Sequence, residues 1–262
     1  MSTLADATTP SADGTLEIRE GWRQGRGAYG GLTIGAALRA IEQRVADPRR
    51  RVRTVTAEIP APTLPGSATF TVDVLRSGSS LTLARASLHQ GSEVTTHVVA
   101  VLAAARPVTD PPAWRELAPP DAPAWRSVAP IPLVVGAFPE FAQHFEYRIV
   151  TGIPFSKGSA VTIGWIRPLA PGAPRDAAFV AAMIDAWWPA ALVRANAPRP
   201  LATIAYTLEM VDGADSLDPD APLLYRGTVP IASEGYFLET RELWTADGRL
   251  VAINHQTFAV IR

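Results

Sequence analysis

The sequence predicts an α+β protein made of two similar repeats, each with one long helix and an antiparallel sheet. Stretches in which apolar and polar residues alternate recur along the 262 residues, with short turns between them. One stretch in each half instead predicts a helix. The order of elements in the first 105 residues recurs after residue 140, which indicates an internal duplication. A sheet covered by a lone helix leaves apolar surface open, so two copies side by side form a natural unit.

The first repeat is expected to begin with a strand in residues 14–25, where apolar and charged residues alternate. From Gly31 the spacing becomes that of an amphipathic helix ending near "DPRR". Its apolar stripe comprises Ile34, Leu38, Ile41 and Val45. Four strands follow, separated by the turns "RSGSS" and "HQGSE": residues 52–59, 68–75, 80–88 and 94–103.

Residues 106–140 have a different composition, with nine of the 24 prolines. This predicts a linker that packs on the surface through Trp114 and Trp125. The expected organisation is therefore an N-terminal repeat in residues 1–105, the linker, and a C-terminal repeat in residues 141–262.

The second repeat is expected to contain a helix in residues 175–195. Pro189 cannot donate to the Asp185 carbonyl four residues before it, so a kink is expected there. Six strands are predicted around this helix: residues 145–150, 159–169, 201–210, 223–232, 236–244 and 249–262. The ends of the two repeats align best, and the matched pairs are Ser77 with Ser233, Arg85 with Arg241, Gly91 with Gly248 and Val94 with Val251.

Composition excludes several kinds of chemistry. The chain has no cysteine, which rules out disulfides, thiolate metal sites and cysteine nucleophiles. Its formal net charge of −1 gives no electrostatic reason to expect binding to nucleic acid or an anionic membrane. The first residues lack a basic segment followed by an apolar run, and no stretch resembles a membrane span. A soluble cytoplasmic protein is expected.

The stretch "GRGAYG", residues 25–30, satisfies the G-x-G-x-x-G pattern of dinucleotide-binding folds. That pattern requires a buried parallel strand before it, whereas the preceding residues alternate with Glu17, Arg19 and Glu20. The acid at a suitable distance, Asp47, lies at a helix exit. These glycines are therefore expected to let a strand turn into a helix whose first amides stay open.

Three polar residues of the second repeat could carry chemistry. Asp185 is the only charged residue between Asp176 and Arg194, and it fits two roles equally: a cap at a helix break, or a general base facing a pocket. Thr203 lies in a predicted strand, where threonine is common. Gln256 interrupts an apolar last strand and shares one face with Asn254.

The segment "AYGGLTIGAALRAI" resembles the Gly-Gly helix entry of the type II acyl-CoA thioesterases. Residues 51–103 also resemble that family: a short apolar strand, a proline-containing turn, and a strand ending in arginine with a Gly-Ser turn. The similarity covers the chain outside the proline-rich linker. It implies a double hot-dog fold, in which each of two long helices is wrapped by a curved antiparallel sheet.

The resemblance also implies a catalytic trio. The family has its aspartate shortly before a "P-x-A-L"-like stretch, which is "PAAL" here and selects Asp185. Its threonine lies in an "A-T-I" strand, as Thr203 does, although Ala205 and Tyr206 replace the Asp-His pair that often follows. Its glutamine lies four residues after "L-V-A", as Gln256 does.

These residues would activate a water molecule that hydrolyses an acyl-CoA directly, without a metal or a cofactor. Open amides at the helix start would bind the oxyanion, with Gly30 and Gly31 as candidates. A hot-dog hydratase would need an aspartate five residues before a histidine, which no histidine here has. The remaining alternative is a non-catalytic hot-dog protein that binds acyl-CoA or another lipid. Because hot-dog sheets usually bury a face by self-association, at least a homodimer is expected.

Overall fold

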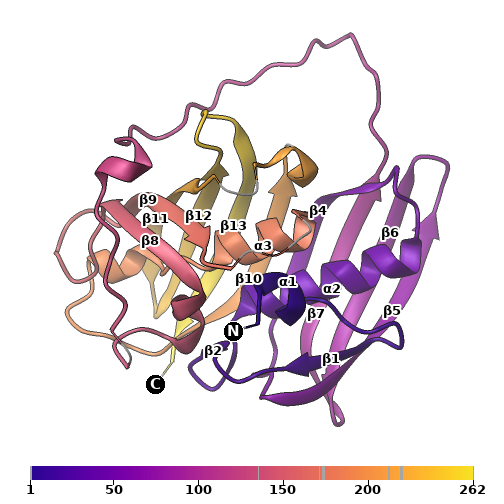
Figure 1. The fold of residues 1–262 in the computed structure, drawn as a ribbon, viewed down its shortest axis with the longest axis horizontal. Helices are drawn as coiled ribbons and strands as arrows, with labels where there is room; N and C mark the ends of the chain where they lie inside the picture. Colours follow the sequence, from indigo (N-terminus) through magenta and orange to yellow (C-terminus); the bar gives the residue numbers. More distant parts are fainter. Residues whose placement is uncertain are drawn as a thin grey trace.

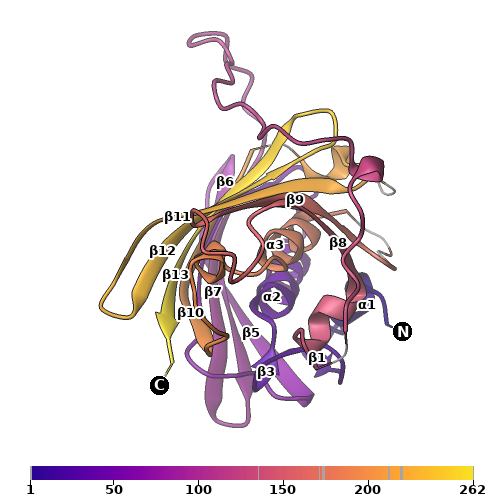
Figure 2. The same ribbon diagram turned by 90° about the vertical axis from the view of Figure 1, so that its left-hand side faces the viewer.

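The structure, a computed structural model, describes residues 2–134, 136–170, 172, 175–211, 213–218 and 221–261. Figure 1 and Figure 2 show one large sheet that curves around the helices. The sheet has eleven strands, and all the pairings between its described neighbours are antiparallel. The α+β architecture predicted from the sequence is confirmed.

The strands of the first half lie in the order β1 (Thr15–Ile18), β5 (Gly66–Ser77), β6 (Leu81–Gln90), β7 (Glu93–Ala103) and β4 (Arg51–Glu58). The second half continues with β10 (Leu201–Met210), β13 (Leu250–Val260), β12 (Tyr236–Trp244), β11 (Leu223–Ser233), β9 (Val161–Pro168) and β8 (Phe145–Thr151). A separate hairpin joins β2 (Arg23–Gln24) and β3 (Gly27–Ala28). The helices are α1 (Leu4–Ala7), α2 (Gly30–Val45) and α3 (Ala177–Asp185), with short 3-10 turns η1 (Trp125–Ser127), η2 (Glu140–His144), η3 (Ala190–Val193) and η4 (Ala214–Ser216).

The two halves of the sheet meet where β4 pairs with β10, with Ala57 opposite Tyr206. Outward from this seam the strand order is equivalent on both sides: β7, β6 and β5 on one, β13, β12 and β11 on the other. A duplicated helix-and-sheet unit produces this symmetry. Division of the chain at residues 105 and 140 stays a proposal, compatible with β7 ending at Ala103 and β8 beginning at Phe145.

Helices α2 and α3 lie antiparallel inside the curve of the sheet (Figure 2). Two glycines on one face of α2 set their close approach. A Cβ on Gly31 would lie 2.9 Å from the Cα of Ala182, and one on Gly35 would lie 2.9 Å from the carbonyl oxygen of Ala178. The start of α2 is thereby brought against the end of α3.

The predicted helix in residues 175–195 is wrong in its second half. Helix α3 ends at Asp185, and a 3-10 turn begins only at Ala190. Because Pro189 has no N–H, the Asp185 carbonyl cannot be used by a continuing helix. The Arg241 side chain donates to this carbonyl and to that of Ile184 instead, at 3.3 and 3.2 Å. The helix therefore ends rather than kinks, and a cation caps its C-terminus.

The alignment of Arg85 with Arg241 is also wrong in register. Arg85 on β6 faces solvent, whereas Arg241 on β12 is buried beneath α3. Successive side chains of a strand alternate between faces, so a match of strands can miss their register by one residue. The strand equivalence holds, but the two arginines do not occupy equivalent positions.

The glycines of residues 25–30 serve local geometry. Gly25 has a φ of +65° in the turn between β2 and β3, a conformation that favours glycine. A Cβ on Gly27 would lie 2.8 Å from the backbone nitrogen of Thr63. No parallel strand precedes them within the described residues, so the dinucleotide fingerprint is not supported.

The proline-rich segment crosses from the first half of the sheet to the second (Figure 1). It packs through Trp125, whose ring lies beneath the guanidinium groups of Arg148 and Arg167 at 4.2 and 4.6 Å. The expectation for Trp114 is wrong, because this residue is 67% exposed.

Among the helices of the described residues, none is long and apolar enough to cross a membrane.

Candidate active site

Asp185 lies at the point where the end of α3 meets the start of α2, and its side chain is 9% exposed. Its Oδ2 accepts a hydrogen bond from the Gly31 amide at 2.6 Å. The start of a helix carries unpaired N–H groups, and the carboxylate of Asp185 accepts from one of them. The glycines at the α2 entry make this approach possible, because a Cβ on Gly31 would lie 2.9 Å from the Cβ of Asp185.

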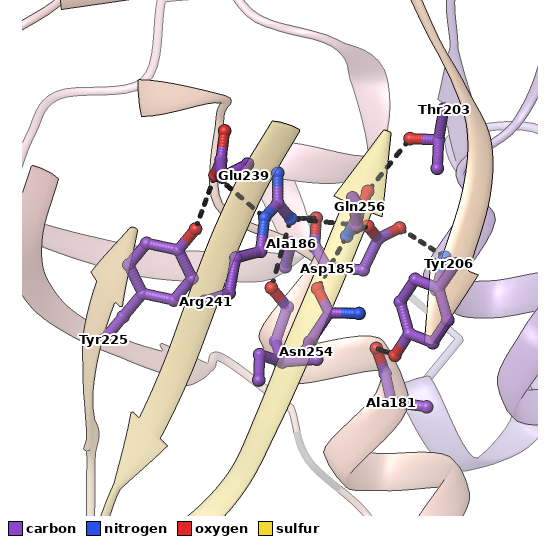
Figure 3. Close-up of polar contacts among 12 residues, drawn as sticks. Ala181, Asp185, Ala186, Thr203, Tyr206, Tyr225, Glu239, Arg241, Asn254 and Gln256 are labelled. Carbon is purple, nitrogen blue, oxygen red and sulfur yellow. Dashed lines mark hydrogen bonds and ion pairs between the residues drawn. The ribbon is translucent and has the colours of Figure 1, made fainter. Parts of the chain in front are cut away.

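Gln256 binds the other carboxylate oxygen. Its Nε2 donates to Asp185 Oδ1 at 2.8 Å and to Asn254 Oδ1 at 2.9 Å, and its Oε1 accepts from Thr203 Oγ1 at 3.0 Å (Figure 3). Because the amide nitrogen faces two acceptors and the amide oxygen faces a donor, the orientation of the amide is fixed. Gln256 and Asn254 are both buried on the inner face of β13, as their shared face predicts.

Thr203 reaches this group because β10 is irregular. Thr203 pairs with Phe258 and Tyr206 pairs with Gln256, and the register shifts between Thr203 and Ala205. The extra residue of this bulge places Thr203 on the inner face together with Tyr206, three residues away, where a regular strand would put them on opposite faces. The structure therefore brings Asp185, Thr203 and Gln256 together.

Two charged residues that the sequence reasoning missed lie next to this trio. Arg241 and Glu239 on β12 are 1% and 0% exposed, and Arg241 Nε donates to Glu239 Oε1 at 2.9 Å. Arg241 also approaches Asp185 Oδ1 at 3.4 Å. They share a face with Phe237 and Leu243, both buried, and this alternation was the available signal.

The buried charges shift one another's protonation. Burial raises the pKa of Glu239, while Arg241 opposes that change. Burial alone would lower the pKa of Arg241, but Tyr225, Glu239 and Asp185 raise it above its ordinary value. Burial, followed by the Asp185 charge, also raises the pKa values of Tyr147 and Tyr206 well above the ordinary value. These tyrosines therefore stay neutral.

The two proposed oxyanion donors differ. The expectation that both amides stay open is wrong for Gly31, because its N–H is bonded to Asp185. The Gly30 amide makes no hydrogen bond to any residue the structure describes. A Cβ on Gly30 would lie 2.9 Å from Ile59 Cδ1 and 3.1 Å from Asp185 Oδ2. The Gly30 amide is therefore the open one beside the carboxylate.

The hydrogen bonds leave unused acceptors on the trio. A carboxylate oxygen can accept more than one hydrogen bond, so Asp185 Oδ2 retains room for a proton beside the Gly31 N–H. The Thr203 hydroxyl donates to Gln256 and keeps its own lone pairs for an incoming donor. A water molecule that donates to both groups would have its oxygen oriented for attack.

The arginines of "DPRRR" lie away from this site. Arg49 and Arg50 are paired with Asp47, and Arg51 is paired with Asp215. They follow the C-terminal end of α2, whose 16 residues span about 24 Å from the Gly30 end. These arginines are therefore held in ion pairs at the end of α2 that lies away from Asp185.

Comparison with known proteins places these features in a family. A family model described as the acyl-CoA thioesterase C-terminal domain matches residues 103–260, and one described as the N-terminal domain matches residues 18–105. A search of curated proteins finds no match.

Solved structures share the whole fold. A hot-dog-fold protein of unknown function from Alicyclobacillus acidocaldarius is 25% identical with a TM-score of 0.88, covering 100% of this chain and 99% of that one. The acyl-CoA thioesterase II TesB2 from Mycobacterium marinum is 20% identical with a TM-score of 0.75, covering 99% and 98%. A tesB protein from Mycobacterium avium subs paratuberculosis is 17% identical with a TM-score of 0.78, with the same coverage. The fold is a double hot-dog.

Proposed function

The chain belongs to the acyl-CoA thioesterase family, and we propose that it hydrolyses a fatty acyl-CoA, or a related acyl thioester, to the free acid and coenzyme A. The observation that carries the proposal is the continuous set of hydrogen bonds from Thr203 through Gln256 to Asp185. This set ends at a helix start with one open amide, that of Gly30. A base, water-orienting groups and an oxyanion donor are what direct hydrolysis requires.

In the proposed reaction, Asp185 takes a proton from water while the water oxygen forms a bond to the thioester carbonyl carbon. Thr203 and Gln256 orient that water, and the Gly30 amide donates to the oxyanion of the tetrahedral intermediate. The carbon–sulfur bond then breaks and the thiolate of coenzyme A leaves. Because a thiolate is a good leaving group, no strong general acid is needed, and the proton held by Asp185 can pass to the sulfur or to solvent. Neither a metal nor a cofactor takes part in this scheme.

A panel of acyl-CoA substrates, with free coenzyme A and free acid detected by mass spectrometry, tests the proposal. Release of both products with at least one acyl chain supports it. Tight binding of many acyl chains without turnover would favour the non-catalytic binder instead. A parallel panel of acyl carrier protein thioesters would show which carrier is used.

Two further features belong to the proposal. We infer that the chain assembles at least as a homodimer, because a hot-dog sheet usually buries a further face by self-association. A cytoplasmic location remains a prediction of the sequence.

A further inference from the structure

The ion pair between Glu239 and Arg241 is buried under the end of α3 and has no part in the proposed proton transfer. Its two side chains satisfy each other and the surrounding polar groups. Glu239 Oε1 accepts from Arg241 Nε and from the Tyr225 hydroxyl, at 2.9 and 3.1 Å. Burying an ion pair costs desolvation free energy, and apolar residues of similar volume often stabilise a protein as well or better. Stability alone therefore does not explain why this pair is here, and its contacts indicate its role.

Those contacts span the break after α3. On one side, Arg241 NH1 donates to the carbonyls of Ile184 and Asp185 and approaches the Asp185 carboxylate. On the other side, Glu239 Oε2 accepts from the backbone amide of Ala190 at 3.0 Å. Figure 3 shows the arginine and the carboxylate of Asp185 in one line of polar contacts. One ion pair thus binds both ends of the segment that separates α3 from η3.

We propose that Glu239 and Arg241 form a positioning pair that sets the direction in which Asp185 leaves the end of α3. This inference rests on the proposed function of Asp185. Without a fixed helix end, the carboxylate could not reach the Gly31 amide and the Gln256 amide at once. The pair touches no substrate atom; it acts through Asp185.

The other end of α3 offers a matched control. Arg39 donates to Asp176, the N-cap of α3, at 2.8 Å, and their side chains are 7% and 19% exposed. Each end of the helix is therefore held by an arginine, but only Arg241 lies beside Asp185. Loss of Arg39 should reduce stability without changing how the carboxylate is aimed.

The test replaces both charges at once with Arg241→Met and Glu239→Gln, since removal of one partner would leave an unpaired buried charge. The kcat of this double variant should fall about 100-fold, the usual loss for a displacement near 1 Å, while KM changes little. In an Asp185→Asn background, the same two changes should lower kcat by less than about threefold, because their effect passes through the missing carboxylate. Arg39→Met should leave kcat within about threefold of wild type.

A readout without substrate completes the test. The Gly31 amide proton, bonded to a carboxylate, should be strongly downfield in the NMR spectrum of the wild-type protein and should lose that shift in the double variant. The shift should persist in Arg39→Met. If the double variant does not fold, Arg241→Lys keeps the charge but cannot bond Glu239 and two carbonyls together, and a partial loss of the Gly31 shift is expected.

Two results would overturn the positioning role. One is an unchanged chemical shift of the Gly31 amide proton in the folded double variant. The other is a double variant that lowers kcat as much in the Asp185→Asn background as in the wild-type protein. A wild-type protein that hydrolyses no thioester would overturn the proposed function alone, because the amide shift would still report on the pair.

Discussion

At the scale of single residues, Asp185 carries the sharpest test of mechanism. Asp185→Asn keeps the size of the side chain but removes the base, so kcat should fall about 10²–10⁴-fold, roughly 3–5.5 kcal/mol. The three groups that the structure shows bonded to the Asp185 carboxylate are donors, so the new amide nitrogen must face one of them, and a stability loss of about 1–3 kcal/mol is expected. Steady-state kinetics and thermal unfolding of the purified variant check both values. Activity within about threefold of wild type in a folded variant would remove Asp185 from the reaction.

Gln256 should matter through the orientation of water. Gln256→Ala removes the amide that holds both the Asp185 carboxylate and the Thr203 hydroxyl, so kcat should fall about 10–1,000-fold, roughly 1.4–4 kcal/mol. Thr257, the next residue on β13, points to the opposite face, so Thr257→Ala is the matched control and should retain wild-type turnover. Equal turnover of the two variants with the best substrate would contradict a role for Gln256.

The sequence allowed part of this site to be predicted. Asp185 and Gln256 are conspicuous as polar residues within apolar stretches, although 71 positions separate them. Thr203 has no such signal, and its inward direction depends on a bulge that strand alternation does not reveal. Arg241 was matched to the exposed Arg85, so its burial was missed. The hydrogen bond from the Gly31 amide to Asp185 depends on the contact between α2 and α3, and no local sequence pattern reveals that contact.

At the scale of elements, the α2–α3 contact depends on glycine. Gly35→Ala would place a Cβ 2.9 Å from the Ala178 carbonyl oxygen, a backbone atom that cannot move independently. The helices must shift apart, which should cost about 1–3 kcal/mol. Gly158→Ala is a suitable control because its new Cβ would meet nothing closer than 3.5 Å. Urea unfolding of both variants checks the difference, and equal stabilities would show that the contact can relax.

Most elements could be predicted because their apolar periods are regular. The stripe of Ile34, Leu38 and Ile41 is buried, as a helix with one apolar face requires. The extent of α3 could not be predicted from its apolar run, since Trp187 and Ala190 remain buried after the helix has ended. Apolar content reports burial there, whereas the helix end is set by Pro189 and by Arg241 from a distant strand.

At the scale of the whole molecule, the outer face of the sheet should be covered in solution. Three apolar side chains of the β11–β12 hairpin are exposed: Ile231 at 61%, Tyr236 at 52% and Leu238 at 40%. Ile231 and Leu238 lie opposite each other, so they share one surface. We expect at least a homodimer in sedimentation at micromolar protein concentration. A strictly monomeric profile would contradict it.

Global stability should also depend on pH through Glu42. Burial, reinforced by the nearby Asp176 and opposed by Arg39, raises the pKa of Glu42 from 4.5 to about 7. Between these values the folded protein holds a proton that the unfolded chain releases, so the free energy of unfolding falls as pH rises through this window. Glu42→Gln removes that dependence. The variant should match wild type near pH 4.5 and exceed it near pH 9 by about 1–3 kcal/mol, with partial exposure of the side chain favouring the lower value.

Urea unfolding at both pH values measures this difference, and the comparison with wild type cancels the titration of every other group. Glu17→Gln, which changes an exposed carboxylate on β1, is the control. Its free energy of unfolding should differ from that of wild type by the same small amount at both pH values. If Glu42→Gln also changes stability equally at the two pH values, then Glu42 ionises as readily in the folded protein as in the unfolded chain. The end of α2 would in that case be open enough to solvate the Glu42 carboxylate.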